Sequence, residues 1–481
     1  MGKSFDSVMH YFKEICAIPH GSYHIDAISD YLADFGKIHG LYVRQDEQKN
    51  IILKKPAAPG YENEPAVILQ GHMDMVAVCD NPGEKDMEKE GIEPVFEGDF
   101  VSAKGTSLGA DDGIAVAYAL ALLSAEDIPH PALEVVLTVN EEVGMEGAKG
   151  IDLSDLAGKR LINIDSEEEG IFTVSCAGGV RMEAVLKGET EAVTAPVVYL
   201  SLDGLAGGHS GSEIHLGRAN GAHLIGDVLL YLIDEGYDVR LISMAAGEKD
   251  NAIPNSGSAE FAVVGLNDVE EFMAIAEEYN DELKEEYGEV EEDIRITLGI
   301  QLPEEVTAYD ADSTEIFLEF LDEEPDGVIS EYEDIDMVKT SLNLGVMKLD
   351  AEGLVTVFAL RSSVSEEIAE LKENVAEIAA NYGANVEFHG EYPGWEYAPV
   401  SPFRDKMTAV YGKLYNREPR VEGIHAGLEC GFFVEKIKGL EAVSIGPDMK
   451  NVHTTKERMD LRSAERVWEY LLCLLAEKDA G

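Results

Sequence analysis

The sequence predicts an α/β protein: a split domain with a central, mostly parallel sheet flanked by helices, plus an inserted α+β domain. Short β-branched runs alternate with helical segments in the first third of the chain; this pattern changes near residue 195 and resumes after residue 394. The length of 481 residues suits two or three domains at a typical ~100–200 residues each. We therefore expect one domain from residues 1–190 and 394–481 and an inserted domain from residues 191–393.

The first part of the chain is expected to supply most of the central sheet. The apolar runs Ala66–Gln70, Leu133–Asn140 and Leu161–Asp165 have the composition of buried strands. Ile114–Ser124 predicts a helix packed on them, and apolar residues at helical spacing over 5–15 predict a helix near the start. A polar, acid-rich turn follows each strand. Because ligands of open α/β sheets bind beyond the carboxyl ends of the strands, we expect the functional site in these turns.

The inserted range is expected to alternate strands and helices, which is typical of α+β sandwiches. We expect strands at Val197–Leu202, Val239–Met244 and Ala259–Val264, a hairpin at Asn343–Phe358, and helices at Asn220–Asp234, Val269–Tyr287, Ser313–Leu321 and Glu366–Tyr382. After Pro393-Gly394 the strand Glu441–Ile445 returns to the α/β pattern.

The chain is strongly acidic. Lysine and arginine number 37 and aspartate and glutamate number 94, which gives a formal net charge of −57. Such a surface repels nucleic-acid phosphates and anionic headgroups, so we expect no nucleic-acid and no membrane partner. It attracts cations. We interpret the bulk of the charge as a solubility device or an adaptation to salt.

The cysteines and the apolar runs predict a cytoplasmic protein. The five cysteines are scattered and form no CxxC pair, which excludes a disulfide framework and a thiolate zinc site. The N-terminus has no basic stretch followed by an apolar core. The longest apolar run, Ile114–Leu123, is much shorter than the ~20 residues that cross a bilayer.

Five short segments carry histidines and carboxylates, four of them at the ends of expected strands. They are Gly71–Asp74 (GHMD), Gly109–Gly113 (GADDG), Asn140–Gly144 (NEEVG), Asn163–Ser166 (NIDS) and Asn451–His453 (NVH). Crowded carboxylates raise one another's pKa or destabilise a site unless cations neutralise them. Two divalent ions would do so. Mixed imidazole and carboxylate ligands suit zinc, with manganese or cobalt as alternatives.

The spacing inside these segments predicts different roles. Residues i and i+2 of an extended segment share a face, so His72 can bind a metal while Asp74 accepts its other ring N–H. Neighbouring strand residues point to opposite sides, so one of Glu141 and Glu142 can bind metal while the other takes a proton from a metal-bound water. An acid in the Asp111 turn could bridge two ions ~3.5–4 Å apart.

These segments, in this order, resemble a known family. The chain contains GHMDMV, SLGADDGIAVA, NEEVGMEGA, NIDSEEEG, GGHSGSEIHLGRANG, IHAGLECGFF and GPDMKNVH. They are similar to those of the bacterial aminoacyl-histidine dipeptidases, also called Xaa-His or cytosol non-specific dipeptidases. These belong to the dinuclear-zinc peptidases that include carboxypeptidase G, aminoacylase and carnosinase. The similarity runs over nearly the whole chain.

The resemblance implies a role for each metal-site residue. It implies two divalent metal ions held by His72, Asp111, Glu142, Asp165 and His453, with Asp111 as the bridge. It makes Glu141 the general base and later acid, and Asp74 the residue that orients His72. It also implies a cis peptide bond between Asp111 and Asp112.

The resemblance also assigns a role to the inserted domain. In this family that domain is a lid that binds substrate and often mediates homodimerisation. His209 matches a residue that polarises the scissile carbonyl, while Asn251 and Arg361 match residues that hold the substrate, Arg361 through its terminal carboxylate. Backbone N–H groups of Gly423–Gly431 could also bind a carboxylate, although a tight packed turn is an alternative.

We therefore expect metal-dependent hydrolysis of unblocked dipeptides, including Xaa-His dipeptides such as carnosine, with broad specificity. One alternative keeps the bimetallic site but acts on N-acyl amino acids or tripeptides, because the lid decides the substrate. A second alternative is a non-catalytic, metal-binding regulatory protein on the same scaffold. The presence of Glu141, which needs no metal contact, speaks against it.

Overall fold

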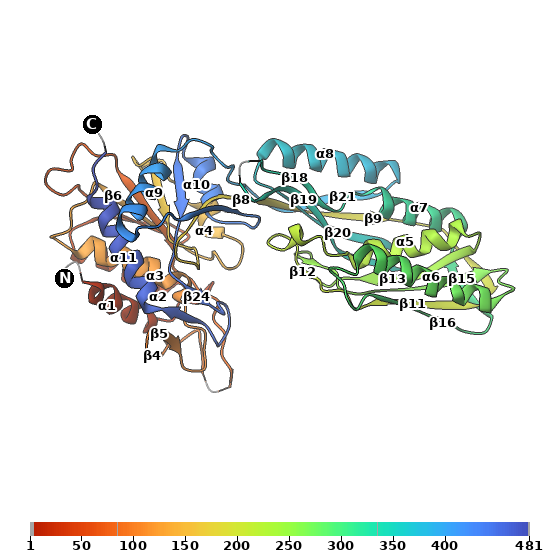
Figure 1. Ribbon diagram of the computed structural model, residues 1–481. Helices are drawn as coiled ribbons and strands as arrows, with labels where there is room; N and C mark the ends of the chain where they lie inside the picture. Colours follow the sequence, from red (N-terminus) through yellow and green to blue (C-terminus); the bar gives the residue numbers. More distant parts are fainter. Residues whose placement is uncertain (1–3, 84, 334, 480–481) are drawn as a thin grey trace. The chain divides into compact units, whose positions relative to one another are not determined.

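The computed structural model describes residues 4–83, 85–333 and 335–479, and the chain forms two compact units (Figure 1). The first unit comprises Met1–Cys176, Tyr397–Gly423 and Leu428–Gly481, and the second comprises Ala177–Glu396 and Ile424–Gly427. The predicted fold class is confirmed, because an α/β unit built from separate sequence pieces holds an inserted α+β unit. The chain enters the second unit at residue 177 because the next strand pairs with strands of that unit.

The first unit is built around one mixed sheet. In sheet order its strands are β1 (Tyr42–Gln45), β2 (Ile51–Lys55), β6 (Leu133–Thr138), β3 (Val67–His72), β7 (Arg160–Asn163), β23 (Glu441–Ser444), β8 (Ile171–Cys176) and β22 (Arg420–Ile424). The central pairs β6–β3, β3–β7 and β7–β23 are parallel, while β1–β2, β2–β6 and β23–β8 are antiparallel. All residues of β3 and β6 are buried, as expected for strands covered on both faces.

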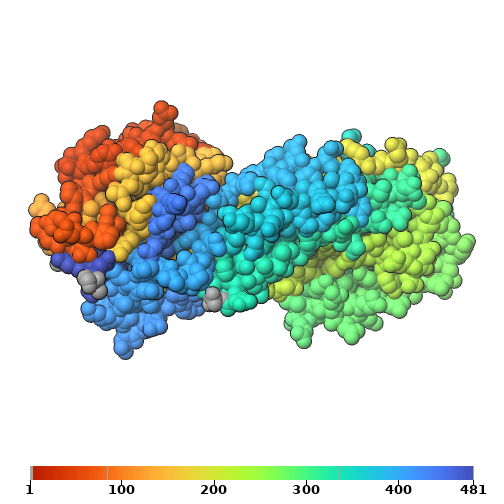
Figure 2. Space-filling model, turned by 90° about the horizontal axis from the view of Figure 1, so that it is seen from above, coloured from red at the N-terminus to blue at the C-terminus, as the bar shows by residue number. Residues whose placement is uncertain are grey.

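Helices cover this sheet. They are α1 (Phe5–Cys16), α2 (Asp26–Ile38), α3 (Ala110–Ser124), α4 (Glu146–Gly150), α9 (Pro402–Tyr415), α10 (Cys430–Lys436) and α11 (Leu461–Ala476). Helix α3 is apolar on all sides because it is buried between neighbours, and its Tyr118 stacks on Trp468 of α11. Figure 2 shows the early and late parts of the chain, coloured red to yellow and blue, together in this unit.

A small antiparallel sheet in the first unit carries one of the loops that matter for function. Its order is β24 (Met449–Lys450), β25 (Arg458–Asp460), β5 (Phe100–Ala103) and β4 (Pro94–Glu97). The loop between β24 and β25 contains His453. Pairing of β25 with β5 thereby ties a late segment of the chain to an early one.

The second unit is an antiparallel sheet with helices along it (Figure 1). In sheet order its strands are β16 (Arg295–Ile300), β11 (Val197–Asp203), β15 (Gly257–Val264), β13 (Asp238–Ala246), β19 (Val338–Asp350), β20 (Gly353–Ser362), β9 (Gly178–Leu186) and β21 (Asn385–Tyr392), and β18 (Gly327–Glu331) also pairs with β19. The helices are α5 (Gly221–Asp234), α6 (Val269–Tyr287), α7 (Ala311–Glu323) and α8 (Ser365–Asn381). One hydrophobic core joins the sheet to these helices.

Two short ribbons complete the second unit. One pairs β10 (Thr190–Ala195) with β17 (Glu304–Tyr309), and the other pairs β12 (Gly208–His209) with β14 (Ala252–Ile253). Among the residues that the structure describes, no helix combines the length and the apolar character needed to cross a membrane.

Candidate metal centre

The carboxyl ends of three parallel strands meet at the candidate metal centre. His72 is the last residue of β3, Glu141 and Glu142 follow β6, and Asp165 follows β7. Because β3 lies between β6 and β7 in the sheet, all four side chains start from adjacent strand ends. These side chains therefore lie at the carboxyl ends of the strands, where the sequence predicts the site.

The Asp111 carboxylate lies between two histidines. Its Oδ1 atom is 3.1 Å from Nε2 of His72, and its Oδ2 atom is 3.0 Å from Nε2 of His453. Asp111 comes from the first turn of α3, and His453 comes from the loop between β24 and β25. This arrangement places Asp111 where a bridging ligand would have to lie.

Two further carboxylates complete two groups of possible ligands. Asp165 Oδ1 is 3.4 Å from His72 Nε2, and Glu142 Oε1 is 3.0 Å from His453 Nε2. Ligand atoms bound about 2.0–2.1 Å from one tetrahedral zinc ion lie about 3.3 Å from one another. The histidine-to-carboxylate separations of 3.0–3.4 Å therefore fit shared metal ions, and Asp111, Glu142 and His453 offer ligand atoms that all lie within 4.8 Å of one another.

The electrostatics of this cluster also fit divalent cations. Burial alone would lower the pKa of His72, but the carboxylates around it, Asp165 first, raise this pKa well above its ordinary value. Hydrogen bonds to Asp111 and Glu142 raise the pKa of His453 to about 10. Burial, partly offset by His72, raises the pKa of Asp165 to about 6. These shifts reflect buried carboxylates in excess of positive charge, which bound cations would neutralise.

The ring of His72 turns Nδ1 toward Asp74, but its hydrogen-bond acceptor is the main-chain oxygen and not the carboxylate that the sequence predicts. Its Nδ1 atom lies 3.0 Å from the main-chain carbonyl oxygen of Asp74, within hydrogen-bond distance, whereas the nearest carboxylate oxygen of Asp74 is 3.6 Å away. The Asp74 carboxylate instead accepts hydrogen bonds from the Glu141 N–H at 3.0 Å and the Ser22 hydroxyl at 2.8 Å. Asp74 thus fixes His72 through its backbone and fixes the start of the Glu141 segment through its side chain.

Glu141, for which the sequence predicts the role of proton acceptor, lies beside the cluster. Single ligand atoms of Glu141, Glu142 and His72 lie within 4.8 Å of one another. Burial raises the pKa of Glu141 well above its ordinary value, and nearby carboxylates add to this effect while His72 opposes it. The predicted division between two adjacent glutamates is consistent with this geometry, because Glu142 faces His453.

Asp112 is a buried carboxyl group whose contact with His72 the sequence did not indicate. Its Oδ2 atom accepts the His72 main-chain N–H at 3.1 Å, and burial raises its pKa well above the ordinary value. A side chain at Gly71 would come within 2.3 Å of this oxygen, so the close approach requires glycine there. The peptide bond between Asp111 and Asp112 is cis, as the family resemblance implied.

Buried polar side chains near the ends of β3, β6 and β7 are joined by hydrogen bonds. Asn163 donates to the Gln70 side-chain oxygen at 2.6 Å, and Gln70 and Thr138 both donate to Glu429, at 2.5 and 2.6 Å. These residues belong to β7, β3 and β6, apart from Glu429, which directly precedes α10. Burial raises the pKa of Glu429 to about 7. Sequence reasoning missed these contacts, although Glu429 lies inside a quoted motif.

Glu457 joins the two loops that carry Asp111 and His453. Its carboxylate accepts three consecutive main-chain N–H groups, those of Leu108, Gly109 and Ala110, at 2.8, 3.1 and 2.8 Å. Because Glu457 is four residues after His453, this contact sets one loop against the other. No feature of the local sequence pointed to it.

The predicted substrate residues lie in the second unit, and two of them are neighbours. A side chain at Gly211 would meet the ring of His209 at 3.0 Å and Nε of Arg361 at 3.2 Å, so both lie next to this glycine. His209 Nδ1 accepts the N–H groups of Gly211 and Ser212, at 3.1 and 3.0 Å, which leaves the proton on Nε2. Arg361 donates to the Tyr392 hydroxyl at 3.0 Å.

Asn251 and the Gly423–Gly431 segment lie near the His209 loop and Arg361 through contacts of other groups. The Asn251 carbonyl accepts the Ser210 N–H at 3.0 Å, so Asn251 lies beside the His209 loop, with its own side chain exposed. Within the Gly423–Gly431 segment, His425 is buried and its Nε2 atom is 2.7 Å from the Ser341 hydroxyl. Burial and Arg361 lower the pKa of His425 to about 3, so a neutral ring lies near Arg361.

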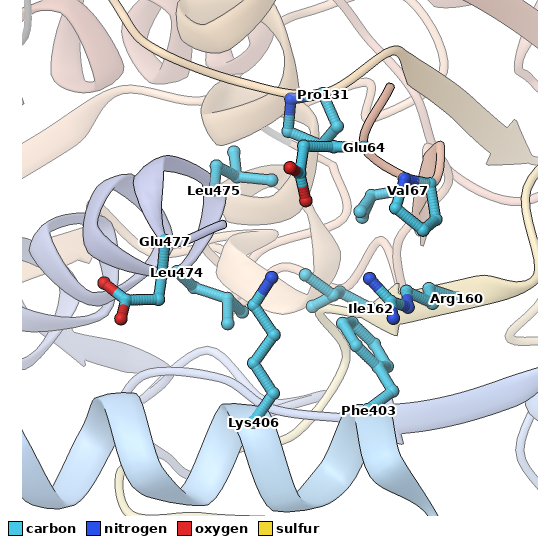
Figure 3. A pocket seen from close by; sticks show the side chains of 11 residues that line it. Glu64, Val67, Pro131, Arg160, Ile162, Phe403, Lys406, Leu474, Leu475 and Glu477 are labelled. Atoms are coloured by element: carbon cyan, nitrogen blue, oxygen red, sulfur yellow. The ribbon is translucent and has the colours of Figure 1, made fainter. Parts of the chain in front are cut away.

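A cavity at the other ends of the parallel strands has different chemistry (Figure 3). It is lined by Val67 and Arg160, which begin β3 and β7, and by apolar residues of α9 and α11. Arg160 and Lys406 there both bind the Asp479 carboxylate, at 2.7–3.0 Å and 2.8 Å. The two basic side chains of this cavity are therefore already paired with the C-terminal segment. For this reason we assign the functional site to the carboxyl ends of the strands and not to this cavity.

Comparisons with known proteins identify the family. Residues 68–477 match the model of Peptidase family M20/M25/M40. The cytosol non-specific dipeptidase of Escherichia coli strain K12 is 37% identical over 472 residues, which cover 97% of this chain and 96% of that protein.

Solved structures show the same relationship. The crystal structure of an aminoacylhistidine dipeptidase from Vibrio alginolyticus is similar with a TM-score of 0.92 and 34% identity, covering 98% of this chain and 97% of that one. The aminopeptidase PepT from Bacillus cereus shares the fold, with a TM-score of 0.58 and 16% identity over 98% of each chain. With this family model matching residues 68–477 and a relative 37% identical over 97% of the chain, this chain belongs to Peptidase family M20/M25/M40.

Proposed function

We propose that this protein is a metal-dependent dipeptidase that hydrolyses unblocked dipeptides, including Xaa-His dipeptides such as carnosine. The observation that carries the proposal is the Asp111 carboxylate between His72 and His453, with Glu141 beside it. Two relatives named as dipeptidases, each similar over nearly the full length of both chains, support the substrate class.

The proposed metal ligands are the side chains that approach one another around Asp111. We assign one ion to His72, Asp111 and Asp165, and the other to His453, Asp111 and Glu142. The donor set of imidazole and carboxylate suits zinc, with manganese or cobalt as alternatives. Bound divalent ions would supply Lewis acidity that polarises the peptide carbonyl and makes water more acidic.

The protein's own groups then move the proton and hold the peptide. Glu141 takes a proton from the attacking water and returns it to the leaving amine nitrogen. His209 carries its proton on Nε2 and can donate it as a hydrogen bond to the developing oxyanion, a contact typically worth about 100-fold or more in rate. Arg361 binds the terminal carboxylate of the substrate, and Asn251 helps to hold it.

The test is a substrate panel measured before and after metal removal. Carnosine, Ala-Ala, a tripeptide and an N-acetyl amino acid are offered to the untreated protein, the chelated protein, and the chelated protein after addition of zinc, manganese or cobalt. We expect dipeptide hydrolysis that chelation abolishes and metal restores. Binding of two metal equivalents without hydrolysis of any dipeptide would reject the proposal, and faster cleavage of the N-acetyl amino acid or the tripeptide would favour the alternative substrates.

An amidated dipeptide tests how the substrate is recognised. If Arg361 binds the terminal carboxylate, amidation of Ala-Ala removes the charge that this guanidinium pairs with, and kcat/KM should fall at least about tenfold. The Arg361→Lys variant should lose most of this discrimination, because lysine cannot reproduce the bidentate contact. Equal rates for free and amidated Ala-Ala in the natural protein would exclude this role of Arg361.

We further propose a cytoplasmic location and a homodimer formed through the second unit. The relative named as a cytosol dipeptidase supports the location. The family resemblance supports the dimer. Light scattering on the purified protein gives the mass in solution and would contradict the dimer if it returned the 52.4 kDa of a single chain.

A further inference from the structure

A groove of about 860 Å³ lies next to the metal centre within the first unit. Two chain segments, Gly21–His24 and Met75–Cys79, form its sides, and Pro82, residues 85–88 and Val143 complete the lining. Ligand pockets for small molecules typically have volumes of about 300–1,000 Å³, so the groove is large enough for part of a peptide. We call these residues, together with Glu142, the side-chain groove.

The side-chain groove is continuous with the metal centre. Glu142 lines the groove and also contacts His453 in the metal centre. Ser22 donates its hydroxyl to the Asp74 carboxylate at 2.8 Å, and the Tyr23 N–H donates to the Asn140 side chain at 2.8 Å. The segment that forms one side of the groove is therefore fixed to the ends of the same strands that carry the predicted ligands.

The two sides of the groove are also fixed to each other. Gly21 pairs with Met75 in a parallel bridge, and the Ser22 N–H donates to the Met75 carbonyl at 3.3 Å. A side chain at Gly21 would come within 2.8 Å of the Ala77 methyl group, so the two segments touch at this point. The groove is thus a preformed feature of the first unit.

We infer that the side-chain groove holds the side chain of the amino-terminal residue of the dipeptide and favours apolar side chains there. This inference rests on the proposed function. The carbonyl that is cleaved belongs to the amino-terminal residue, and the Cα atom of that residue is bonded directly to the reacting carbon. Its side chain must therefore lie beside the metal ligands. The groove bordered by Glu142 offers space there.

The chemistry of the walls sets the preference. Met75, Val76, Val78, Met87 and Val143 present thioether and branched aliphatic groups. Lys85, Asp86 and Glu88 also line the groove, and two of these charges are paired, Asp86 with Lys89 at 2.7 Å and Glu88 with His24 at 3.4 Å. Methionine side chains adapt to different shapes, which suits broad specificity. Each methylene group transferred fully from water to such a surface is worth about fourfold in binding. A leucine side chain should therefore be favoured over alanine at the amino-terminal position by at least about tenfold, even in a groove that stays partly open.

The test introduces a negative charge into the wall of the side-chain groove and measures the preference among dipeptides. Val78 is half-buried and its backbone bonds to Ser107, so Val78→Asp should keep the loop while placing a carboxylate in the groove. Ile38→Asp, at an apolar residue that is 81% exposed at the end of α2, makes the same chemical change outside the groove and serves as the matched control. The kcat/KM values of Leu-Ala, Ala-Ala, Lys-Ala and Ala-Leu are measured, together with bound metal.

We expect Val78→Asp to lower the Leu-Ala to Ala-Ala ratio at least about fivefold and to raise Lys-Ala relative to Leu-Ala, since a buried carboxylate repels an apolar group and attracts an ammonium group. The ratio of Ala-Leu to Ala-Ala should stay unchanged. Ile38→Asp should leave all ratios as in the natural protein. Should Val78→Asp fail to fold or lose metal, Met87→Asp provides the same measurement from another part of the wall.

Two results would overturn the inference while leaving the proposed function intact. The first is dipeptide hydrolysis with ratios in Val78→Asp and Met87→Asp that equal those of Ile38→Asp. The second is a change that follows the carboxyl-terminal residue, seen as an altered Ala-Leu to Ala-Ala ratio. An absence of hydrolysis of every dipeptide by the natural, metal-loaded protein would instead overturn the proposed function, and the inference with it.

Discussion

The two carboxylate oxygens of Asp111 face two different histidines, and each histidine has a further carboxylate beside it. Asp165 lies 3.4 Å from His72 and Glu142 lies 3.0 Å from His453, while Glu141 offers a ligand atom within 4.8 Å of those of His72 and Glu142. At the residue scale, two adjacent glutamates therefore occupy different environments. Their expected functions differ for the same reason.

Exchange of Glu141 for glutamine tests this division. Glu141→Gln keeps the size of the side chain and removes its capacity to take a proton, so we expect bound metal to be unchanged and kcat to fall at least about 100-fold. Asp111→Ala should lose bound metal as well as activity, because it removes the group between both histidines. Metal content by elemental analysis and dipeptide turnover separate the two outcomes. Turnover in Glu141→Gln equal to that of the natural protein would reject its role.

Two elements far apart in the sequence contribute to the metal centre, and the carboxylate of Glu457 links them. The first turn of α3 presents Asp111, and the loop between β24 and β25 presents His453. Glu457 binds the three N–H groups that lead into α3 and lies in the same loop as His453. At the element scale, we therefore expect the distance between Asp111 and His453 to depend on the Glu457 carboxylate.

A conservative exchange at Glu457 should weaken metal binding without unfolding the protein. Glu457→Gln replaces one acceptor oxygen by an NH2 group that faces main-chain donors. We expect metal affinity to fall about 10–100-fold, the range typical of residues that support metal ligands. Titration calorimetry with zinc measures it, and Glu465→Gln, at an exposed position of α11, is the matched control. Equal affinities in the two variants would show that Glu457 does not position the loops.

Helix α7 ends at a buried carboxyl group that should make stability depend on pH. Glu324 is 3% exposed, and neither of its oxygens has a hydrogen-bond partner among the residues that the structure describes. Burial raises the pKa of Glu324 to about 8 from an ordinary value of 4.5. Between these two values the folded chain binds more protons than the unfolded chain, so the contribution of Glu324 to stability decreases as the pH rises.

Glu324→Gln should therefore stabilise the protein, and more so at higher pH. Glutamine stays neutral, so the variant avoids the cost of keeping a proton on the buried carboxyl group. We expect a gain in the free energy of unfolding on the order of 1–3 kcal/mol at pH 7, close to zero at pH 4.5. Denaturant unfolding at several pH values measures it, with Glu315→Gln on the exposed side of α7 as control. A gain that does not change with pH would contradict this account.

The large negative charge of the molecule should lower its stability through electrostatic repulsion. A net charge of −57 in one chain means that carboxylates repel one another over most of the surface. Salt shortens the range of this repulsion, from about 10 Å at 0.1 M to about 3 Å at 1 M. At the scale of the molecule, ionic strength should therefore decide part of the stability.

Salt should raise the melting temperature of the natural protein. We expect Tm to increase by several degrees between 0.05 M and 1 M sodium chloride, because screening reduces repulsion in the folded state more than in the expanded unfolded state. Calorimetry at fixed metal concentration measures this, and sucrose at matched osmolality controls for non-ionic effects. A Tm that is independent of sodium chloride would show that repulsion is already balanced by pairing.

Sequence patterns predicted the central strands of the first unit and the helices α5, α6, α7 and α8 of the second unit. The strands expected at Ala66–Gln70 and Glu441–Ile445 are β3 and β23, and the expected helix at Val269–Tyr287 is α6 with the same bounds. Strands of the second unit such as β9 and β21 were not predicted, because their partners lie far away in the sequence and pairing, not local composition, defines them.

The sequence by itself determined which residue types stand at the ends of apolar strands, because period and composition are local properties. Those were sufficient to predict where His72, Asp165 and the two glutamates would gather. Only the tertiary structure decided the contacts that join distant segments, such as those of Glu457 with the N–H groups before Asp111 and of Glu429 with Gln70 of β3 and Thr138 of β6. A hydrogen bond between residues hundreds of positions apart depends on how the elements pack, and packing leaves no local pattern in the chain.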